Sequence, residues 1–386
     1  MKFRIGLFAV CILLIVFLFA CTTKQIFDNN NDTEVVSKNQ PSHTHIPDLG
    51  QDVLPPSFNG LLELYSNEPV FQRGLDRTWD QAIVDPGVIL SHNGIFHVFY
   101  NGIQHYSPLR GGTYDSTLQK CSVGYAVSTD GYDWYRMTDS PIITLDDIGY
   151  ETYNARVSSV VLTDDGTWVM YIYTQSNDSI HPPGVILRAT ADNPAGPWIF
   201  DDFPILSPGS NGTWDSYALR FPDVIRTDDG YSMYYTGYFS GTSQGSTNAL
   251  MGLATSRDGV TWSKWDNPIT DDDLFRESDP VFGPGDADWG RRSLKTYRVW
   301  QTTDGWNMIF ALSLNYFGTS SFGYASSSDG TTWHHFEGNP VFSSQDLRNA
   351  TSVGCSDIIY INGKYYFYFN ASKDEFTGDI YLAISE

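Results

Sequence analysis

The sequence is poor in basic residues: it holds 23 Lys and Arg against 45 Asp and Glu, a formal net charge of −22 at pH 7. Binding to nucleic acid needs a basic surface that meets the phosphates, so we expect no nucleic-acid partner. The sequence also lacks any long segment with the i, i+3, i+4 apolar spacing of an amphipathic helix. Aromatic residues make up 15% of the chain, which favours an all-β protein rich in turns.

Several signatures of cofactor and hydrolase classes are missing. There is no glycine-rich phosphate loop, no H-E-x-x-H zinc motif and no G-x-S-x-G nucleophile motif. We therefore predict no cofactor and no metal ligands. Asp271, Asp272 and Asp273 form an acidic turn, for which a solvated loop and a bound Ca²⁺ ion are both open readings.

The first residues resemble an export signal. Lys2 and Arg4 precede the apolar run Ile5–Ala20, which is shorter than the roughly 20 residues of a membrane span and fits a signal peptide. Ala20-Cys21 is similar to a bacterial lipoprotein cleavage site; an ordinary signal peptide and an uncleaved anchor are the alternatives.

We expect an exported monomer at the cell surface or in the periplasm, held to the membrane only through lipid on Cys21. Residues 1–20 are predicted as signal peptide, 21–57 as a lipidated Cys followed by a disordered linker, and 58–386 as one folded domain. Cys121 and Cys355 are the cysteines of that domain, and a disulfide or two separate thiols are both compatible with the sequence.

Two phrases repeat along the domain. S-x-D-G-x-x-W occurs at Ser128–Trp134, Ser256–Trp262 and Ser327–Trp333, with a variant, ADNPAGPW, at Ala191–Trp198. A proline followed by Ile or Val comes soon after the Trp, at Pro141, Pro268 and Pro340. The second phrase is a pair of β-branched and aromatic runs around a tight turn. Its turn glycines are Gly94, Gly166, Gly230, Gly305 and Gly363.

These repeats predict a five-bladed β-propeller with four antiparallel strands per blade. The D-G of S-x-D-G-x-x-W would turn the chain between the third and fourth strands, and its Trp would pack between neighbouring blades. The last blade lacks a fourth strand. Gly60–Phe71 matches the fourth-strand pattern, so the N-terminal strand is expected to close the ring.

Inner strands of a propeller converge on a central funnel, which suits a polar ligand. Counting back from each turn glycine gives the residues at the start of each inner strand. If the strand is regular there, residues nine and seven before the glycine share one face. The residues that carry charge at these places are Asp85, Arg156, Arg220, Asp223, Lys295, Arg298 and Asp357. Either the basic members pair with the inner aspartates, or they form a subsite for a uronate, a sulfate or a phosphate.

An aromatic-carboxylate pair precedes several inner strands. Trp79-Asp80, Tyr150-Glu151 and Trp214-Asp215 stand at similar distances ahead of their strands. An aromatic ring can stack on a sugar while the carboxylate binds its hydroxyls. A structural turn between blades explains the pairs equally well.

The five-unit pattern, the D-P-x-V of Asp85–Val88 and the ADNPAGPW phrase resemble the arabinanase–levansucrase–invertase superfamily of five-bladed glycosidases, which includes glycoside hydrolase families 43, 32 and 130. The resemblance implies that Asp85 is a base or nucleophile. The R-D-P-x-V of invertase-like members falls on Arg156–Val160, where the Asp is missing. The Glu-x-Pro of family 43 falls on Arg220–Pro222, where Arg replaces the acid. Hydrolysis of glycosides normally needs two carboxylates.

We therefore predict a carbohydrate-active propeller that binds an oligo- or polysaccharide, first of all a glycoside hydrolase of plant or microbial glycans. Asp85 would be base or nucleophile and Asp223 the acid or the modulator of its pKa, with Glu151, Asp215 and Asp357 as further candidates. Substrate would contact Trp79, Asp80, Arg156, Trp214, Asp215, Arg220, Lys295, Arg298 and Asp357. The alternatives are a phosphorylase that uses phosphate and a glycan-binding propeller without catalysis.

Overall fold

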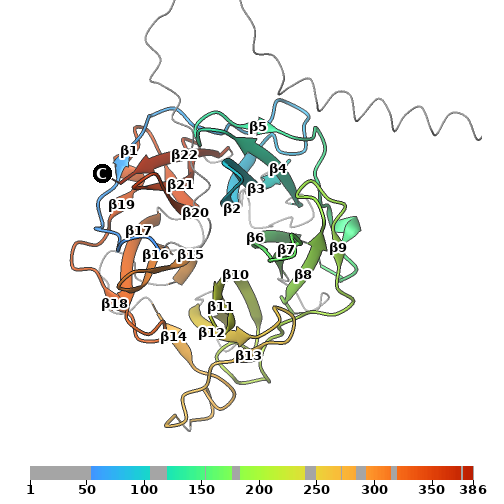
Figure 1. Cartoon of the computed structure of the whole chain (residues 1–386), viewed down its shortest axis with the longest axis vertical. Coiled ribbons are helices and arrows are strands. Elements are labelled where there is room, and N and C mark those ends of the chain that lie inside the picture. The colour runs from blue at the N-terminus through green and yellow to red at the C-terminus, as the bar shows by residue number, and fades with distance from the viewer. Residues whose placement is uncertain are drawn as a thin grey trace, which may run out of the picture. The chain divides into compact units, whose positions relative to one another are not determined.

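The computed structural model describes residues 54–104, 120–152, 154–175, 183–239, 249–270, 272–283, 293–313, 320–374 and 377–385. These residues form five antiparallel sheets arranged as the blades of a ring, which confirms the predicted five-bladed propeller (Figure 1). The predicted signal peptide and most of the predicted linker lie outside the described residues. Within the described part, no helix is long and apolar enough to cross a membrane.

The strands follow the chain around the ring. Blade 1 holds β2 (Ile83–His92), β3 (Ile95–Ile103), β4 (Cys121–Ser128) and β5 (Tyr135–Arg136), and blade 2 holds β6 (Asn154–Leu162), β7 (Trp168–Gln175), β8 (Ile186–Ala191) and β9 (Ile199–Phe200). Blade 3 holds β10 (Ala218–Thr227), β11 (Gly230–Tyr238), β12 (Leu250–Ser256), β13 (Ser263–Lys264) and β14 (Pro280–Phe282). Blade 4 holds β15 (Ser293–Thr302), β16 (Gly305–Ser313), β17 (Ser320–Ser327), β18 (His334–His335) and β19 (Phe342–Ser343). Blade 5 holds β20 (Ser352–Ile361), β21 (Lys364–Ser372), β22 (Asp379–Ile384) and β1 (Glu63–Leu64).

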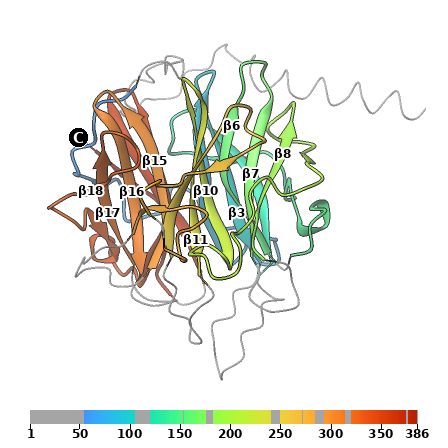
Figure 2. The ribbon, with the colours of Figure 1, turned by 90° about the horizontal axis from the view of Figure 1, so that it is seen from below.

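The first strand of each blade is the inner one, and β2, β6, β10, β15 and β20 surround the centre of the ring (Figure 1). Tight turns join each inner strand to the second strand. All five predicted turn glycines have positive φ, from 71° to 130°, a conformation that glycine adopts without a steric penalty. We call the end with these turns the hairpin face and the end where the inner strands begin the funnel face; Figure 2 shows the strands running between the two ends.

The S-x-D-G-x-x-W phrase joins neighbouring blades, as predicted. In the copy of blade 4, Ser327 Oγ accepts the N–H of Gly330 at 2.9 Å, and Asp329 accepts two further backbone N–H groups. Tyr234 of blade 3 donates its hydroxyl to the Gly330 carbonyl at 3.0 Å and packs edge-on against Trp333. Tyr368 and Tyr171 make the same bond to Gly131 and Gly259 in the other two copies.

The outer edge of each blade is completed after the Trp by a short apolar segment. Ile142 and Val341 donate their N–H groups to β4 and β17, at 2.8 Å in both cases. In blade 3, however, the corresponding Pro268-Ile269 does not take this place. Ile269 is 87% exposed, and Pro280–Phe282 forms β14 against β12 instead. A longer connection separates the Trp from its outer segment in this blade.

The N-terminal segment completes blade 5. Glu63 and Leu64 pair with Ile384 and Ala383, and Phe71 bridges to Ile380. Before β1 the chain runs along the hairpin face: the Pro55 carbonyl accepts the N–H of Thr303 at 3.0 Å, and the Pro56 carbonyl accepts the hydroxyl of Tyr365 at 2.5 Å. Phe58 is buried among residues of blades 4 and 5.

The apolar core lies between the blades. One cluster fills the space between blades 1 and 2 around Phe99, Tyr125 and Trp168. Corresponding clusters lie between each following pair, including blades 5 and 1 around Tyr100 and Tyr368. Each blade therefore contributes both of its faces to the core, and the ring is stable only when adjacent blades are packed.

Tyr234→Phe tests the bond between blades 3 and 4. The ring and its packing are kept, but the buried carbonyl of Gly330 loses its donor, so we expect the free energy of unfolding to fall by roughly 1–2 kcal/mol. Chemical denaturation measures this, with Tyr135→Phe as the control because Tyr135 is 66% exposed. Equal stability of the two variants would show that the bond contributes nothing.

Candidate active site

The five inner strands bring their first residues together at the funnel face, where each strand carries an irregularity. The register shifts between Pro86 and Val88 in β2 and at corresponding places in β6, β10, β15 and β20. A bulge adds a residue to one strand and re-aims its side chains. The prediction that residues nine and seven before each turn glycine share one face assumed a regular strand. The inner strands are not regular at this point.

A cavity lies among these bulges, with about 300 Å³ of empty space including the part open to solvent. It combines one carboxylate, two arginines and several hydroxyl groups and aromatic rings. Among the described residues that line it, Asp85 is the only acidic one. The lining residues are Asp85, Pro86, Gly87, Asn101, Arg156, Val157, Ser158, Tyr173, Phe221, Thr296, Tyr297, Arg298, Cys355 and Ser356.

Asp85 is buried and held from both sides. Its Oδ2 lies 2.6 Å from Arg156 Nη1, and its Oδ1 accepts a hydrogen bond from Asn101 Nδ2 at 3.0 Å. Asn101 also donates to the Val157 carbonyl at 3.0 Å and accepts the Val157 N–H at 2.9 Å. Asn101 of blade 1 thus fixes Asp85 against the backbone of blade 2, and the carboxylate has a defined orientation.

Arg156 is the charged partner of Asp85. Burial is the largest single influence and lowers the pKa of this arginine, but Asp85 together with Cys121, Tyr173 and Cys355 outweighs it and holds the pKa well above its ordinary value. Two thiols lie in the same region. Cys121 and Cys355 are both free, so the disulfide alternative is excluded, and burial raises the pKa of each to about 12. The thiols are therefore neutral neighbours of the ion pair.

Arg298 links two aspartates from other blades. Its Nη1 lies 2.6 Å from Asp223 Oδ1 and its Nε 2.7 Å from Asp357 Oδ1. Asp223 also accepts the N–H of Val299 at 2.6 Å, and Asp357 accepts the N–H groups of Ile89 and Ile358. These three charged side chains thereby join blades 3, 4, 5 and 1; we call them the axial network.

The axial network changes the interpretation of Asp223. Neither Asp223 nor Asp357 lines the cavity, although Arg298 does. Burial raises the pKa of both acids, that of Asp357 to about 6, and Arg298 opposes the rise. The predicted pairing of inner arginines with inner aspartates is present, as Arg156–Asp85 and as Arg298–Asp223. A catalytic role of Asp223 stays a prediction.

Arg220 and Lys295 complete the basic set. Arg220 is buried, and its guanidinium carbon lies 4.8 Å from the centre of the Tyr238 ring. Lys295 is half-buried, and burial lowers its pKa, which the nearby Cys355 opposes. Among the residues that the structure describes, Lys295 has no hydrogen-bond or ion-pair partner. It is therefore a basic side chain beside the lining residue Thr296 that no carboxylate in the described ranges contacts.

The two Trp-Asp pairs lie within the blades. Trp214 is 1% exposed, stacks on Tyr235 and donates its Nε1–H to the Ser278 carbonyl at 2.7 Å. Asp215 is fully buried and lies 2.5 Å from Lys264 Nζ on the outer strand β13. This arrangement favours the structural alternative for the pair, because the ring of Trp214 is not accessible to a sugar.

The pair in blade 1 repeats this arrangement. Trp79 stacks on Tyr100, and Asp80 lies 2.9 Å from Arg136 Nη2 on the outer strand β5. The backbone at Gly102 approaches the Trp79 ring so closely that an added Cβ would lie 2.3 Å from it, and Gly237 is equally close to Trp214. Trp79 and Asp80 therefore support the blade rather than line the cavity.

Glu151 lies apart from the cavity. It is exposed, three residues ahead of β6, and it is absent from the described cavity lining. Its neighbour Tyr150 packs against the core between blades 1 and 2 and donates its hydroxyl to the Pro183 carbonyl at 3.1 Å. The catalytic role predicted for Glu151 stays a prediction without geometric support.

Of the fourteen lining residues, only Asp85, Arg156 and Arg298 belonged to the predicted site; Asn101, Tyr173 and Cys355 are among those that it lacked. Asn101 and Tyr173 belong to the second strands, which the counting along inner strands did not include. One sequence signal could have identified Asn101, because it is an amide at the end of an otherwise apolar strand. Cys355 has φ of +35° in the blade 5 bulge, which no sequence pattern indicated.

The described residues contain no group of three or more His, Cys, Asp or Glu side chains that could hold a metal ion. Asp271, the first residue of the acidic turn weighed for Ca²⁺, lies outside the described residues. The described side chains of the cavity offer one oriented carboxylate and fixed guanidinium groups, with the half-buried Lys295 nearby.

No family model matches the chain. Two curated proteins match part of it at 26% identity. One is an uncharacterized protein of Mycobacterium tuberculosis, with 47% of this chain and 57% of that protein covered. The other is a 1,2-β-oligomannan phosphorylase of Thermoanaerobacter, with 42% and 55% covered. The chain thus spans a little over half the length of these relatives.

Solved structures share the propeller. A glycosyl hydrolase from Bacteroides ovatus superposes with a TM-score of 0.61 at 16% identity, covering 89% of this chain and 97% of that one. Another structure is described by the words "The GH130 family of mannoside phosphorylases contains glycoside hydrolases that target beta-1,2 mannosidic linkages in Candida mannan". It has a TM-score of 0.62 at 16% identity, covering 88% and 96%. These likenesses show that the chain shares the five-bladed β-propeller fold of those structures.

Asp223→Ala tests the axial network. The change leaves Arg298 without one carboxylate and the Val299 N–H without its acceptor, so we expect the free energy of unfolding to fall by about 3–5 kcal/mol. The matched control is Asp164→Ala, which breaks an ion pair with Arg226 in which the Asp164 side chain is 85% exposed; its effect should stay below about 1 kcal/mol. Equal losses in denaturation experiments would contradict a special role of the network.

Proposed function

We propose that the chain is a carbohydrate-active enzyme that cleaves glycosidic bonds in the funnel, in the first instance by hydrolysis. The observation that carries this proposal is the position of Asp85. It is the acidic residue of the described cavity lining, and Arg156 and Asn101 fix both of its oxygens. The likeness of the fold to glycoside-processing propellers supports the proposal without identifying the reaction.

The geometry suits a carboxylate that works in its charged form. In hydrolysis, a water oxygen forms a bond to the anomeric carbon while the bond to the leaving oxygen breaks. A carboxylate such as Asp85 accepts the proton of that water, and a second group protonates the leaving oxygen. Arg156 and Asn101 hold the carboxylate in place before substrate arrives, which lowers the cost of reaching the reactive geometry.

Phosphorolysis is the second candidate, and the surplus of positive charge favours it. Arg156 Nε is buried without a hydrogen-bond partner in the described part of the chain, and Lys295 lacks a carboxylate partner there. Such cations bind an oxyanion well. Phosphate would then attack the anomeric carbon in place of water, so no carboxylate is needed to activate the nucleophile, and a single acidic group suffices to protonate the leaving oxygen as its bond breaks. The partial match to a 1,2-β-oligomannan phosphorylase agrees with this candidate.

Asp85→Asn tests catalysis at the funnel. The full chain and the variant would be incubated with β-1,2-mannobiose, arabinan, xylan and pectic oligosaccharides, each with and without inorganic phosphate, and the products read by mass. We expect cleavage by the unchanged chain and a loss of at least about 100-fold in the variant. Asp164→Asn, an exposed carboxylate of blade 2, is the matched control and should keep its rate.

The products separate the candidates. Free reducing sugar without phosphate supports hydrolysis, whereas a sugar phosphate formed only in the presence of phosphate supports phosphorolysis. An absence of product in every mixture, together with a raised melting temperature in one of them, would contradict cleavage and support the glycan-binding alternative.

We also propose that the chain is exported as a monomeric lipoprotein anchored at Cys21, as the apolar run and Ala20-Cys21 suggest. Cys21→Ser should then move the protein from the membrane fraction to the soluble fraction of the expressing bacterium and prevent incorporation of labelled palmitate. Detection of the variant in the membrane fraction at the original level would contradict the anchor. Sedimentation velocity of the detergent-solubilised chain tests the monomeric state.

A further inference from the structure

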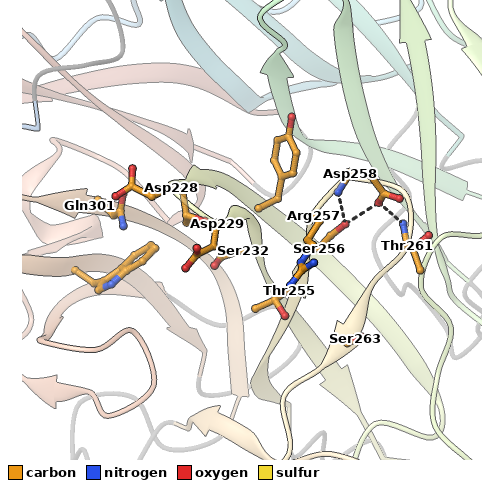
Figure 3. A pocket seen from close by; sticks show the side chains of 13 residues that line it. Asp228, Asp229, Ser232, Thr255, Ser256, Arg257, Asp258, Thr261, Ser263 and Gln301 are labelled. Atoms are coloured by element: carbon orange, nitrogen blue, oxygen red, sulfur yellow. Dashed lines mark hydrogen bonds between the residues drawn. The ribbon is translucent and has the colours of Figure 1, made fainter.

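A second hollow, larger than the funnel cavity, opens at the hairpin face between blades 3 and 4. It contains about 1930 Å³ of empty space, part of it open to solvent. The turn between β10 and β11, the turn after β12 and the hairpin of blade 4 surround it. Figure 3 shows Asp228, Asp229 and Ser232 between Gln301 on one side and Thr255 and Arg257 on the other. We call this hollow the hairpin groove.

The hairpin groove is separate from the funnel. Arg220, near the start of β10, belongs to the funnel face, whereas Thr227 at the end of the same strand lines the groove. Seven residues of extended chain separate them, a distance of about 23 Å. A ligand in the groove therefore cannot be the sugar unit that contacts Asp85.

The groove offers an aromatic ring beside polar groups that no protein partner uses. Trp306 packs edge-on against Tyr234 and stays half-exposed in the groove. Among the described residues, the side chains of Asp228, Asp229, Arg257 and Gln301 make no hydrogen bond or ion pair. The face of an aromatic ring can pack against the C–H groups of a sugar. The carboxylate, amide and guanidinium groups beside it can form hydrogen bonds with the hydroxyls of the same sugar.

Charge narrows the class of ligand. Asp228 and Asp229 outnumber Arg257, and Asp258 is held as a carboxylate because backbone N–H groups lower its pKa to about 2. A groove of this sign repels phosphates, sulfates and uronates. The described residues here form no group that could hold a metal ion either. A neutral ligand rich in hydroxyl groups remains.

We propose that the hairpin groove binds a neutral polysaccharide chain, with Trp306 as the stacking residue and Gln301 and Asp229 as hydrogen-bonding residues. Its open form supports a polymer, because a hollow that is partly open to solvent leaves room for a chain to continue beyond the groove at either end. Such a site binds one stretch of the polysaccharide while a different stretch of the same polymer reaches the funnel. This second binding site is a property in addition to the proposed cleavage at Asp85.

Affinity electrophoresis of the full chain tests the site without requiring any product. The native gels would contain yeast mannan, linear arabinan or arabinoxylan as neutral polymers, and polygalacturonate as the anionic one. We expect at least one neutral polymer to retard the protein and polygalacturonate not to. Trp306→Ala should weaken the affinity for that polymer about ten-fold or more, since a central aromatic contact carries much of the binding free energy.

Further variants separate loss of the site from loss of the fold. Gln301→Ala and Asp229→Ala remove polar groups at the surface of the groove and should each weaken retardation. Tyr135→Ala, an exposed aromatic of blade 1, should not. Asp85→Asn is measured alongside, to detect any part of the retardation that comes from the funnel.

Three results would overturn the proposal: no retardation in any neutral polymer, retardation in polygalacturonate alone, or equal retardation of the unchanged chain and of all three groove variants. Loss of retardation in Asp85→Asn but not in the groove variants would assign the binding to the funnel. Because retardation is independent of product formation, the groove and the cleavage reaction can fail separately.

Discussion

The propeller depends on the contacts that hold one inner strand to the next. Asp223, Arg298 and Asp357 form charged contacts at the axis that reach from blade 3 to blade 1, and Ser159 accepts the Val224 N–H at 3.1 Å between blades 2 and 3. Each blade is a small twisted sheet that buries little surface alone. The five inner strands meet at the axis, so a defect there would weaken the packing between blades on which each blade depends.

The contacts at the axis also limit where a ligand can bind. Asp223 and Asp357 of the axial network do not line the cavity, and the free space lies among the bulges that hold Asp85 and Arg156. Arg298 belongs to both regions, because it lines the cavity and donates to the Gly87 carbonyl at 3.1 Å. Arg298 thus connects the lining of the cavity to Asp223 and Asp357.

The fold could be predicted from the sequence because its signals are local. A turn glycine, a D-G turn and the following Trp each report the conformation of a few adjacent residues, and their repetition gives the number of blades.

The site could be predicted only in part. Asp85 was identified through a resemblance and Arg156 by its place in the repeat, but the bulges shifted the faces, and nothing local reveals that Asn101 spans two blades. The aromatic-carboxylate pairs show the same limit, since burial of Trp214 depends on packing against Tyr235.

The course of the chain before β1 bears on how the molecule meets its surroundings. Pro55 and Pro56 are fixed against Thr303 and Tyr365 on the hairpin face, so whatever precedes Leu54 joins the propeller there. The chain therefore enters the propeller at the end of the inner strands opposite the cavity that holds Asp85, so a change at Pro55 or Pro56 acts on the hairpin face and leaves the lining of the funnel in place.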